Sequence, residues 1–355
     1  MVTPKFINNN SSFHQELKRR VNGYFEQMRK PSTGNMGLYF KAILFCTAYL
    51  GLVVHLIFFT PPNWVAIIEC VLLGGFTAAV GFNVMHDGAH GSFSKNKVTN
   101  KLAAISLNFL GASSIMWNQK HNIIHHTYTN IDGLDDDIEA KPFLRLCPNQ
   151  KRYKMHRFQH YYFWFLYTLL HIVWVFKTDY EKYFSRKIGD IPIKKLSFKD
   201  HLGFWAAKIL YALAFVALPI YLLGFGKWIV GFLITSMTTG FIISIVFQLA
   251  HTVEHTHFPL PVPETNKIEN EWAIHQINTT ANFATKNRLI SWLVGGLNFQ
   301  IEHHLFPKVS HIHYPAISKI IKQTCADFGL VYVEYPRMRH AVASHVAYLR
   351  KLGRA

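Results

Sequence analysis

The chain has 355 residues, half of them hydrophobic, and its 37 Lys and Arg against 20 Asp and Glu give a net charge of +17. The apolar residues lie in long runs and the charges lie elsewhere, which is typical of a polytopic membrane protein and argues against a soluble domain. The basic charge is accompanied by neither a basic–aromatic ladder nor zinc-finger spacing, so it favours an anionic membrane face over nucleic acid as its partner.

The first predicted element is an amphipathic helix near the N-terminus. Apolar residues recur there at helical spacing among basic and polar neighbours: Phe13, Leu17, Val21, Tyr24 and Met28. Such a helix would either lie on the membrane before the first span or pack as an ordinary surface helix. Because no apolar stretch follows the basic residues, we expect no cleavable signal peptide.

Four apolar runs are each long enough to cross a hydrocarbon core ~30 Å thick, which takes about 20 helical residues. They cover residues 42–60, 64–84, 203–223 and 228–250. The turns between them, PPN and GFGK, are short, so the spans pair into two helical hairpins. Lys208, near the start of the third span, is expected to snorkel toward the membrane surface.

The distribution of Lys and Arg predicts the orientation of these spans. The two outer turns hold one basic residue, Lys227, so the N-terminal, middle and C-terminal segments are expected to face the cytoplasm. Two further apolar stretches, 102–116 and 161–176, are short, and we expect them to lie in the cytoplasmic leaflet. His55 and Glu69 lie near the outer ends of spans, where an ordinary solvated role is expected.

These elements predict an all-α integral membrane fold with two transmembrane hairpins and a cytoplasmic helical cap. Residues 1–37 would form an N-terminal cytoplasmic or interfacial segment, residues 38–340 the principal membrane domain, and residues 341–355 a basic C-terminal tail.

The 21 histidines are concentrated in four motifs at or after the cytoplasmic ends of the spans. HDGAH holds His86 and His90, HNIIHH holds His121, His125 and His126, HTVEH holds His251 and His255, and QIEHH holds Gln300, His303 and His304. A single HxxxH or HH motif arises readily by chance. Four of them on one face of the membrane predict a metal site.

The spacing within the motifs indicates a site with two metals. His86 with His90, and His121 with His125, are i, i+4 pairs that stack on one face of a helix and can bind one metal together. His126 and His304 each follow another histidine and are turned away by about 100°, toward a second metal. Neutral imidazole suits iron, zinc and copper, so the ligand type alone does not choose the metal.

The series HxxxH, HxxxHH and QxxHH over two membrane hairpins resembles the membrane-bound fatty acid desaturases, across residues 35–339. The glutamine of the last motif and the stretch FQLAHTVEH resemble the front-end and related acyl-lipid or acyl-CoA branch. The resemblance implies a non-haem di-iron centre of two Fe²⁺ ions, O₂ as co-substrate and a fatty acyl substrate. The matching metal ligands are His86, His90, His121, His125, His126, His251, His303 and His304.

Other polar residues near these motifs are assigned less directly. Gln300 stands where other branches have a ligand histidine, so it would bind metal, hold a water or orient a neighbour. His255 is a weaker candidate, one helical turn beyond His251, and His257, His311 and His313 are expected to be polar loop residues. Carboxylates that would either orient the imidazoles or belong to a solvated loop are Asp87, Asp132, Asp135, Asp136, Asp137 and Glu302.

Desaturation removes two hydrogens that are not acidic, which explains why metal ligands dominate and why GxSxG, P-loop and HExxH motifs are absent. The sequence has no haem-binding cytochrome b5-like extension, no GxGxxG and no ferredoxin spacing among its four cysteines. We therefore expect a separate donor of the ferredoxin or cytochrome b5 type, attracted by the basic face. The acyl tail should lie in an apolar tunnel past the metals.

Two alternatives remain open from the sequence. A related di-iron hydroxylase or ketolase would use the same ligands, and its product would be an alcohol or ketone. A membrane zinc-binding receptor or transporter would hold redox-inactive zinc and tend to place its ligands within the spans.

Overall fold

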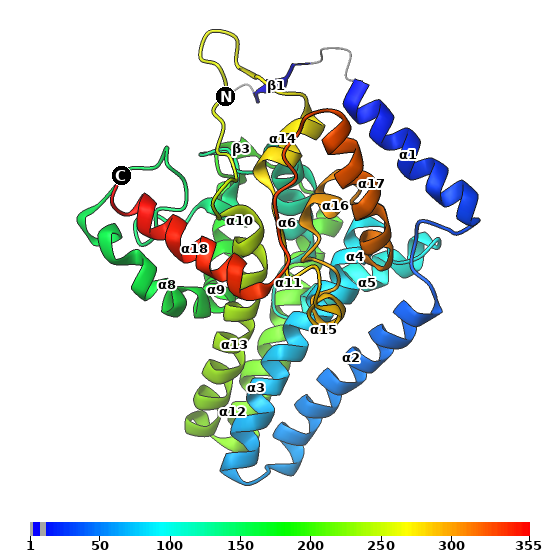
Figure 1. Ribbon diagram of the computed structural model, residues 1–355. Coiled ribbons are helices and arrows are strands. Elements are labelled where there is room, and N and C mark those ends of the chain that lie inside the picture. Colours follow the sequence, from blue (N-terminus) through cyan, green and yellow to red (C-terminus); the bar gives the residue numbers. More distant parts are fainter. Residues whose placement is uncertain (1–2, 8–11) are drawn as a thin grey trace.

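The computed structural model describes residues 3–7 and 12–355 and confirms the predicted all-helical architecture with four spans. Among these residues, four continuous helical segments are long and apolar enough to cross a membrane: Met36–Phe59, Asn63–His90, Phe198–Leu223 and Phe225–His251. They point away from a cap that contains the other helices, and both strand β1 and the C-terminal end of the chain lie in this cap (Figure 1). The two hairpin turns lie at the opposite end of the spans, which we call the outer end.

Each span has a defined helical composition. The first consists of α2 (Met36–Val54) and the π-helical η1 (His55–Phe59), and the second of α3 (Asn63–Val80), the π-helical η2 (Gly81–Met85) and α4 (His86–His90). The third consists of α11 (Phe198–Ala212), η7 (Leu213–Ala217) and α12 (Leu218–Leu223), and the fourth is α13 (Phe225–His251). His55 and Glu69 pair across the first turn, with Nδ1 and Oε1 2.9 Å apart.

The second and fourth spans form the central pair of the bundle. A Cβ on Gly74 would meet the Thr235 carbonyl oxygen at 2.6 Å, so only glycine allows α3 and α13 to approach this closely. The Thr239 hydroxyl donates to the Gly74 carbonyl at 3.1 Å across the same contact. This pair carries the first and third histidine motifs to the cap.

Among the described residues, the two shorter apolar stretches form short helices and not a fifth candidate span, and we call them the interfacial stretches. The first contains α5 (Lys97–Phe109) and α6 (Ser114–Trp117), and the second contains α8 (Gln159–Thr168), α9 (Leu170–Val173) and η6 (Trp174–Thr178), followed by α10 (Asp179–Ser185). Gly240 of α13 lets α8 and α9 lie against the fourth span, since any Cβ there would collide with the Thr168 carbonyl.

The expectation that Lys208 snorkels is wrong. Its side chain is buried, and its ammonium donates to a carboxylate oxygen of Asp179 at 2.7 Å and to the carbonyls of Gly111 and Val175 at 2.8 and 3.1 Å. Asp179 also accepts the Ser113 amide at 2.7 Å. The lysine therefore joins the third span to both interfacial stretches, because a carboxylate close to it satisfies its charge inside the protein.

The cap is built from short helices and three pairs of two-residue strands. Its helices include α1 (Ser12–Met28), α7 (His126–Tyr128), α14 (Trp272–Thr279), α15 (Arg288–Leu293), α16 (Gln300–Leu305), α17 (Tyr314–Asp327) and α18 (Met338–Leu352). Further turns are the π-helical η3 (Asn118–His125) and the 3₁₀ helices η4 (Asp136–Ile138), η5 (Lys154–Phe158) and η8 (His311–His313). The strand pairs are β1 (Lys5–Phe6) parallel to β4 (Lys267–Ile268), β2 (Lys187–Ile188) antiparallel to β3 (Ile191–Pro192), and β5 (Asn282–Phe283) parallel to β6 (Glu334–Tyr335).

Of the two roles weighed for the N-terminal helix, the structure supports the surface helix. Phe13, Leu17 and Val21 of α1 are buried in one hydrophobic cluster with Ile317 and Ile321 of α17. Figure 1 shows these two helices side by side at one edge of the cap. The first three residues of the apolar stripe are thus covered by protein, and Met28 at its end is exposed.

The segment predicted as a basic tail, residues 341–355, forms most of helix α18 and packs into the cap. His345 is fully buried, with its Nδ1 2.6 Å from the Thr252 carbonyl oxygen and its Nε2 2.9 Å from the Tyr167 hydroxyl. It therefore ties the C-terminal helix to α8 and to the end of the fourth span.

Burial lowers the pKa of His345 to about 4. The unfolded chain, with an ordinary histidine pKa of about 6.5, takes up this proton first as the pH falls. The stability that the neutral imidazole contributes is therefore complete above pH ~6.5 and decreases between ~6.5 and ~4, by about 3 kcal/mol at most. We expect the thermal unfolding midpoint in detergent to fall over this range, and His345→Asn to make the fall shallower. An equally steep fall in the variant would contradict this role.

Candidate metal centre

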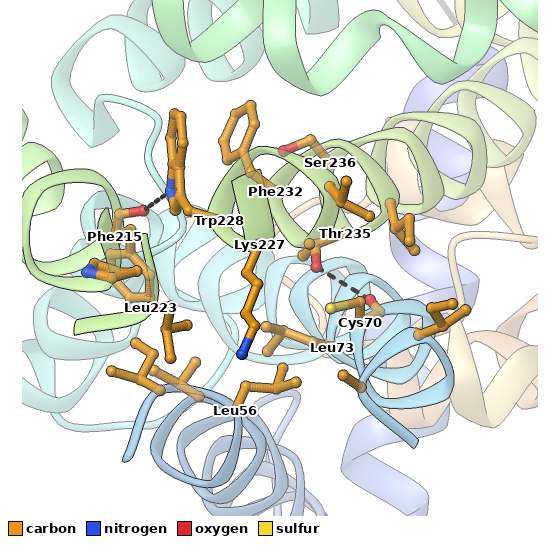
Figure 2. Close-up of a pocket in the computed structure, with 18 of the residues that line it drawn as sticks. Leu56, Cys70, Leu73, Phe215, Leu223, Lys227, Trp228, Phe232, Thr235 and Ser236 are labelled. Atoms are coloured by element: carbon orange, nitrogen blue, oxygen red, sulfur yellow. Dashed lines mark hydrogen bonds between the residues drawn. The ribbon is translucent and has the colours of Figure 1, made fainter. Parts of the chain in front are cut away.

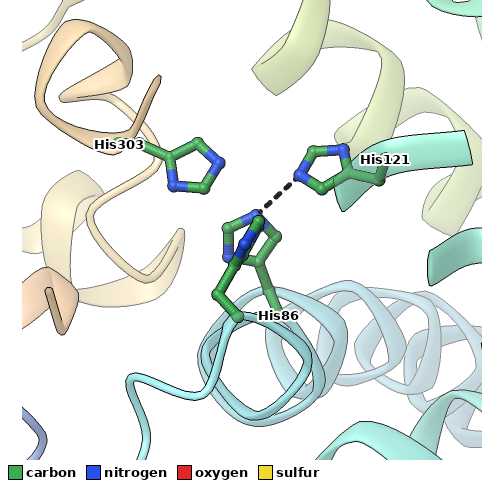
Figure 3. A group of neighbouring side chains, drawn as sticks. His86, His121 and His303 are labelled. Atoms are coloured by element: carbon green, nitrogen blue, oxygen red, sulfur yellow. Dashed lines mark hydrogen bonds between the residues drawn. The ribbon is translucent and has the colours of Figure 1, made fainter. Parts of the chain in front are cut away.

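Four chain segments bring the predicted histidines together at the cap end of the central spans. His86 and His90 lie on α4, where the second span enters the cap, and His251 is the last residue of α13. The middle motif lies on η3 and at the start of α7, and the last motif forms α16. Figure 3 shows the rings of His86, His121 and His303 arriving from three elements and facing one another.

The ligand atoms form three groups among the described residues, and within each group they all lie within 4.8 Å of one another. The first group is His86, His90, His121 and His303; the second is His125, His251 and His304; the third is His121, His125 and Asp137. The last histidine doublet is thus divided, with His303 in the first group and His304 in the second. The first two groups share no residue and could each hold a metal ion, and the third takes one histidine from each of them.

The exposure and hydrogen bonding of these nitrogens fit a cation site. Among the described residues, the buried nitrogens without a hydrogen-bond partner include Nδ1 of His86 and His126 and Nε2 of His90, His125, His251, His303 and His304. A buried polar atom left unpaired costs about 1–3 kcal/mol. A bound ion that accepts the lone pairs of these nitrogens would explain why so many unpaired nitrogens lie in one place. Burial lowers the pKa of His121, His126, His303 and His304 well below the usual value, so these rings are neutral at pH 7.

The position of His126 differs from the one predicted for an α-helix. Residues 118–125 form a π-helix, whose hydrogen bonds join residues five apart and thus bring His126 toward His121. The Nε2 atoms of these two residues are 3.3 Å apart, and the His126 ring centroid lies 4.5 Å from those of both His303 and His304. His126 is therefore central to the cluster and is not directed to one side, although it belongs to none of the three groups.

Several rings are oriented by partners on their other nitrogen. His125 Nδ1 lies 3.1 Å from both Asp135 carboxylate oxygens and 3.2 Å from Asp137. His304 Nδ1 donates to the Gln276 side-chain oxygen at 2.8 Å, and His251 Nδ1 to the Thr279 carbonyl at 3.2 Å. These contacts leave Nε2 free to face the centre, as metal-bound imidazoles require.

Of the carboxylates proposed to orient imidazoles, Asp135 and Asp137 contact one of the histidines of the centre. Asp132 and Asp136 instead pair with lysines. Glu302 accepts the Asn282 amide and the Tyr332 hydroxyl, both at 2.7 Å, and burial raises its pKa to about 7.

Asp87 holds a residue that was expected to lie in a polar loop. His311 is buried, and its Nδ1 lies 2.9 Å from an Asp87 carboxylate oxygen, which also accepts the Ser310 hydroxyl at 2.9 Å. His313 is buried as well, so the polar-loop expectation is wrong for both residues and fits only the exposed His257. The Asp87 contacts fasten the first histidine motif to the segment after the last one.

The two uncertain ligands differ in their positions. Gln300 is buried on α16, and its side-chain nitrogen has no hydrogen-bond partner among the described residues. The helix α13 ends at His251, and His255 beyond it is exposed, with a positive φ of 73° that no α-helix has. It is therefore not one helical turn beyond His251, and it lies outside all three groups.

Sequence reasoning missed the neutral partners Gln276, Thr279 and Tyr314, since no motif or charge marks them. The Tyr314 hydroxyl lies 3.2 Å from His303 Nδ1. We expect Gln276→Leu to weaken metal binding about 10–100-fold, because His304 Nδ1 would lose its shorter contact and keep only the Thr129 hydroxyl at 3.3 Å. Titration of the apoprotein with Fe²⁺ would measure this, and unchanged affinity would show that the contact is unimportant.

A long apolar chamber of about 420 Å³ lies between the two hairpins (Figure 2). Its wall includes Leu56, Leu73, Phe215 and Trp228, and its outer end is lined by Lys227. A second, narrow cavity of about 30 Å³ lies between the chamber and the histidines, and His86 is one of its lining residues. Apolar space thus leads from the spans to the edge of the centre.

Comparison with known proteins finds a match to the family described as fatty acid desaturase over residues 62–336. The chain is 35% identical to the sn-1 linoleoyl-lipid 6-desaturase of Arthrospira platensis over 96% of this chain and 92% of the relative. It is 37% identical to the protein of the same name from Synechocystis sp. over 97% and 96%, and 34% identical to the acyl-lipid (8-3)-desaturase of Physcomitrium patens over 97% and 72%.

Proposed function

Because this chain belongs to the fatty acid desaturase family of oxidoreductases, we propose that it inserts a double bond into a fatty acyl chain in an O₂-dependent reaction at a di-iron centre. The observation that carries the proposal is the meeting of two histidine groups, with unpaired buried nitrogens, at the inner end of an apolar passage.

Two sets of side chains would hold the irons. His86, His90, His121 and His303 would bind one, and His125, His251 and His304 the other, with His126 and Gln300 as further candidates between or beside them. Bound iron would supply the redox chemistry with O₂ that breaks unreactive C–H bonds, which acid–base side chains cannot do. All-nitrogen coordination by imidazole is compatible with iron.

The protein residues around this centre would position the chain and exclude water. Trp117, Phe247 and Met85 line the narrow cavity beside His86, so the reacting methylenes would lie against apolar side chains. Two hydrogens leave the chain with two electrons, whereas reduction of O₂ to two waters takes four electrons. A donor must therefore supply the other two electrons, together with protons from solvent.

The relatives named for linoleoyl-lipid and acyl-lipid substrates support an acyl chain carried on a lipid, with acyl-CoA as the alternative. We place its tail in the passage between the hairpins and its head group at the basic cap. We also place the cap and both termini in the cytoplasm, because Lys227 is the one basic residue of the outer turns. A terminal tag that is accessible from the opposite side would contradict this orientation.

Expression in a host that lacks the product tests the proposal. The host would supply either a ferredoxin or a cytochrome b5, and the positions of double bonds in its lipids would be mapped. We expect a new double bond in the wild type and none with His303→Ala at equal protein level. An alcohol product would indicate a hydroxylase, and product from His303→Ala would refute the ligand assignment.

A further inference from the structure

The chamber and the narrow cavity lie one after the other along the second span. Residues of this span that line the chamber recur every three or four positions and include Asn63, Cys70 and Thr77. The narrow cavity continues the same stripe from Thr77 to His86. The fourth span follows the same order, because it lines the chamber with its outer half and the narrow cavity with Thr239, Ile243 and Phe247. The two spaces thus lie in one line from the outer end to the histidines, which we call the path.

Three side chains line both spaces and mark the boundary between them: Thr77, Leu110 and His171. They come from the second span and from the two interfacial stretches. His171 Nε2 donates to the Leu110 carbonyl at 3.1 Å, which holds the interfacial stretches together at this point. The Thr77 hydroxyl donates to the Leu73 carbonyl of its own helix, which satisfies it without a ligand. We call these three residues the neck.

Two of the three neck residues, Leu110 and His171, come from the interfacial stretches, and they differ in how freely they can move. The Gly240 contact seats α9 directly on the fourth span, so His171 cannot withdraw in that direction without displacing backbone. Leu110 lies just after the end of α5 and is buried. Its side chain is thus the part of the neck that substitution can remove while the hydrogen bond to its carbonyl remains.

We propose that Thr77, Leu110 and His171 select acyl chains by the length of the tail beyond the reacting carbons. This inference rests on the proposed desaturase function. Thr77 precedes His86 by nine residues, about 13 Å along the helix. An extended chain advances about 1.3 Å per carbon, so about ten methylenes reach from the histidines to the neck. Shorter tails end before the neck, and longer tails must pass it into the chamber. The narrow cavity of about 30 Å³ is smaller than either tail, so its walls must move apart when a chain enters.

One variant changes the neck, a second changes the chamber beyond it, and a third is a matched control. Leu110→Ala opens the neck, and Ile234→Phe fills the chamber, which Ile234 lines. Leu233→Phe adds the same side chain at the neighbouring position, which is 40% exposed and does not line the chamber. Cells that express each protein would be fed saturated or unsaturated fatty acids of about 16 to 22 carbons, and conversion at each length would be measured.

We expect Leu110→Ala to raise the ratio of long-chain to short-chain conversion about tenfold, the scale on which a pocket distinguishes single methylenes. Ile234→Phe should lower the same ratio, and Leu233→Phe should leave it unchanged. A second readout does not need turnover: thermal stabilisation of each purified protein by the same free fatty acids. In Leu110→Ala the longer acids should stabilise more than they do in the wild type, even if activity is lost.

The outcomes separate this inference from the proposed function. The proposed role of the neck alone would be overturned if the wild type desaturates and both variants convert, and are stabilised by, the same chain lengths as the wild type. A wild type that converts no chain with either donor would overturn the proposed function and the inference with it. Equal changes in the conversion ratio for Ile234→Phe and Leu233→Phe would also overturn the proposed role of the neck, because filling the chamber would then have no specific effect.

Discussion

Replacing His304 with alanine is expected to release one of two bound irons and to abolish desaturation. His304 belongs to the group of three histidines with His125 and His251, so its loss leaves two imidazoles for that ion. His303→Ala should behave differently, because its group has four histidines and three remain. We expect this variant to retain most of its iron with weaker affinity while activity is also lost.

Iron content per polypeptide, measured on purified protein, would test this difference. A suitable control is His160→Ala, since His160 is buried with both ring nitrogens unpaired but lies outside the three groups. It should keep both irons. Equal iron content in His303→Ala and His304→Ala would show that the two groups do not hold separate ions.

The second large effect is expected from Lys208→Met, which should lower the free energy of unfolding by about 3–5 kcal/mol. The substitution leaves the buried Asp179 carboxylate without its cation and removes the hydrogen bonds to the Gly111 and Val175 carbonyls. A methionine of similar length fills the space but cannot satisfy these oxygens.

The thermal unfolding midpoint in detergent would measure this loss against Lys199→Met, an exposed lysine on the same helix, for which we expect almost no change. Adding Asp179→Leu to Lys208→Met should restore only part of the stability, because the Ser113 amide would then lose its acceptor. A full return to wild-type stability would show that the charges alone matter.

The spans could be predicted from local composition, and the gathering of the histidines at one end of the spans could be predicted from the number of crossings. Apolar runs of fixed length define spans, and the parity of four crossings places the motif of His303 beside those of His86 and His121. The contacts of Lys208 and His311 could not be predicted, since their partners Asp179 and Asp87 are far away in sequence and become neighbours only in the fold. Gln276 and Tyr314 gave no signal because neutral hydrogen-bonding residues occur everywhere.

The prediction of the His126 position was wrong for a different reason. Nothing in the composition of residues 118–125 distinguishes a π-helix from an α-helix, and the predicted rotation of about 100° assumed the latter. Tertiary packing decides between a π-helix and an α-helix. The group to which each histidine belongs therefore could not be assigned from spacing.

The π-helical turns at residues 81–85 and 118–125 have a consequence for how the protein matures. Such turns are rarely stable in isolation and persist where surrounding structure imposes them. The two segments that deliver most of the imidazoles therefore reach their final shape only once neighbouring elements have closed around them. Metal loading would then be the last stage of biogenesis, open to chains that have already completed their assembly in the bilayer.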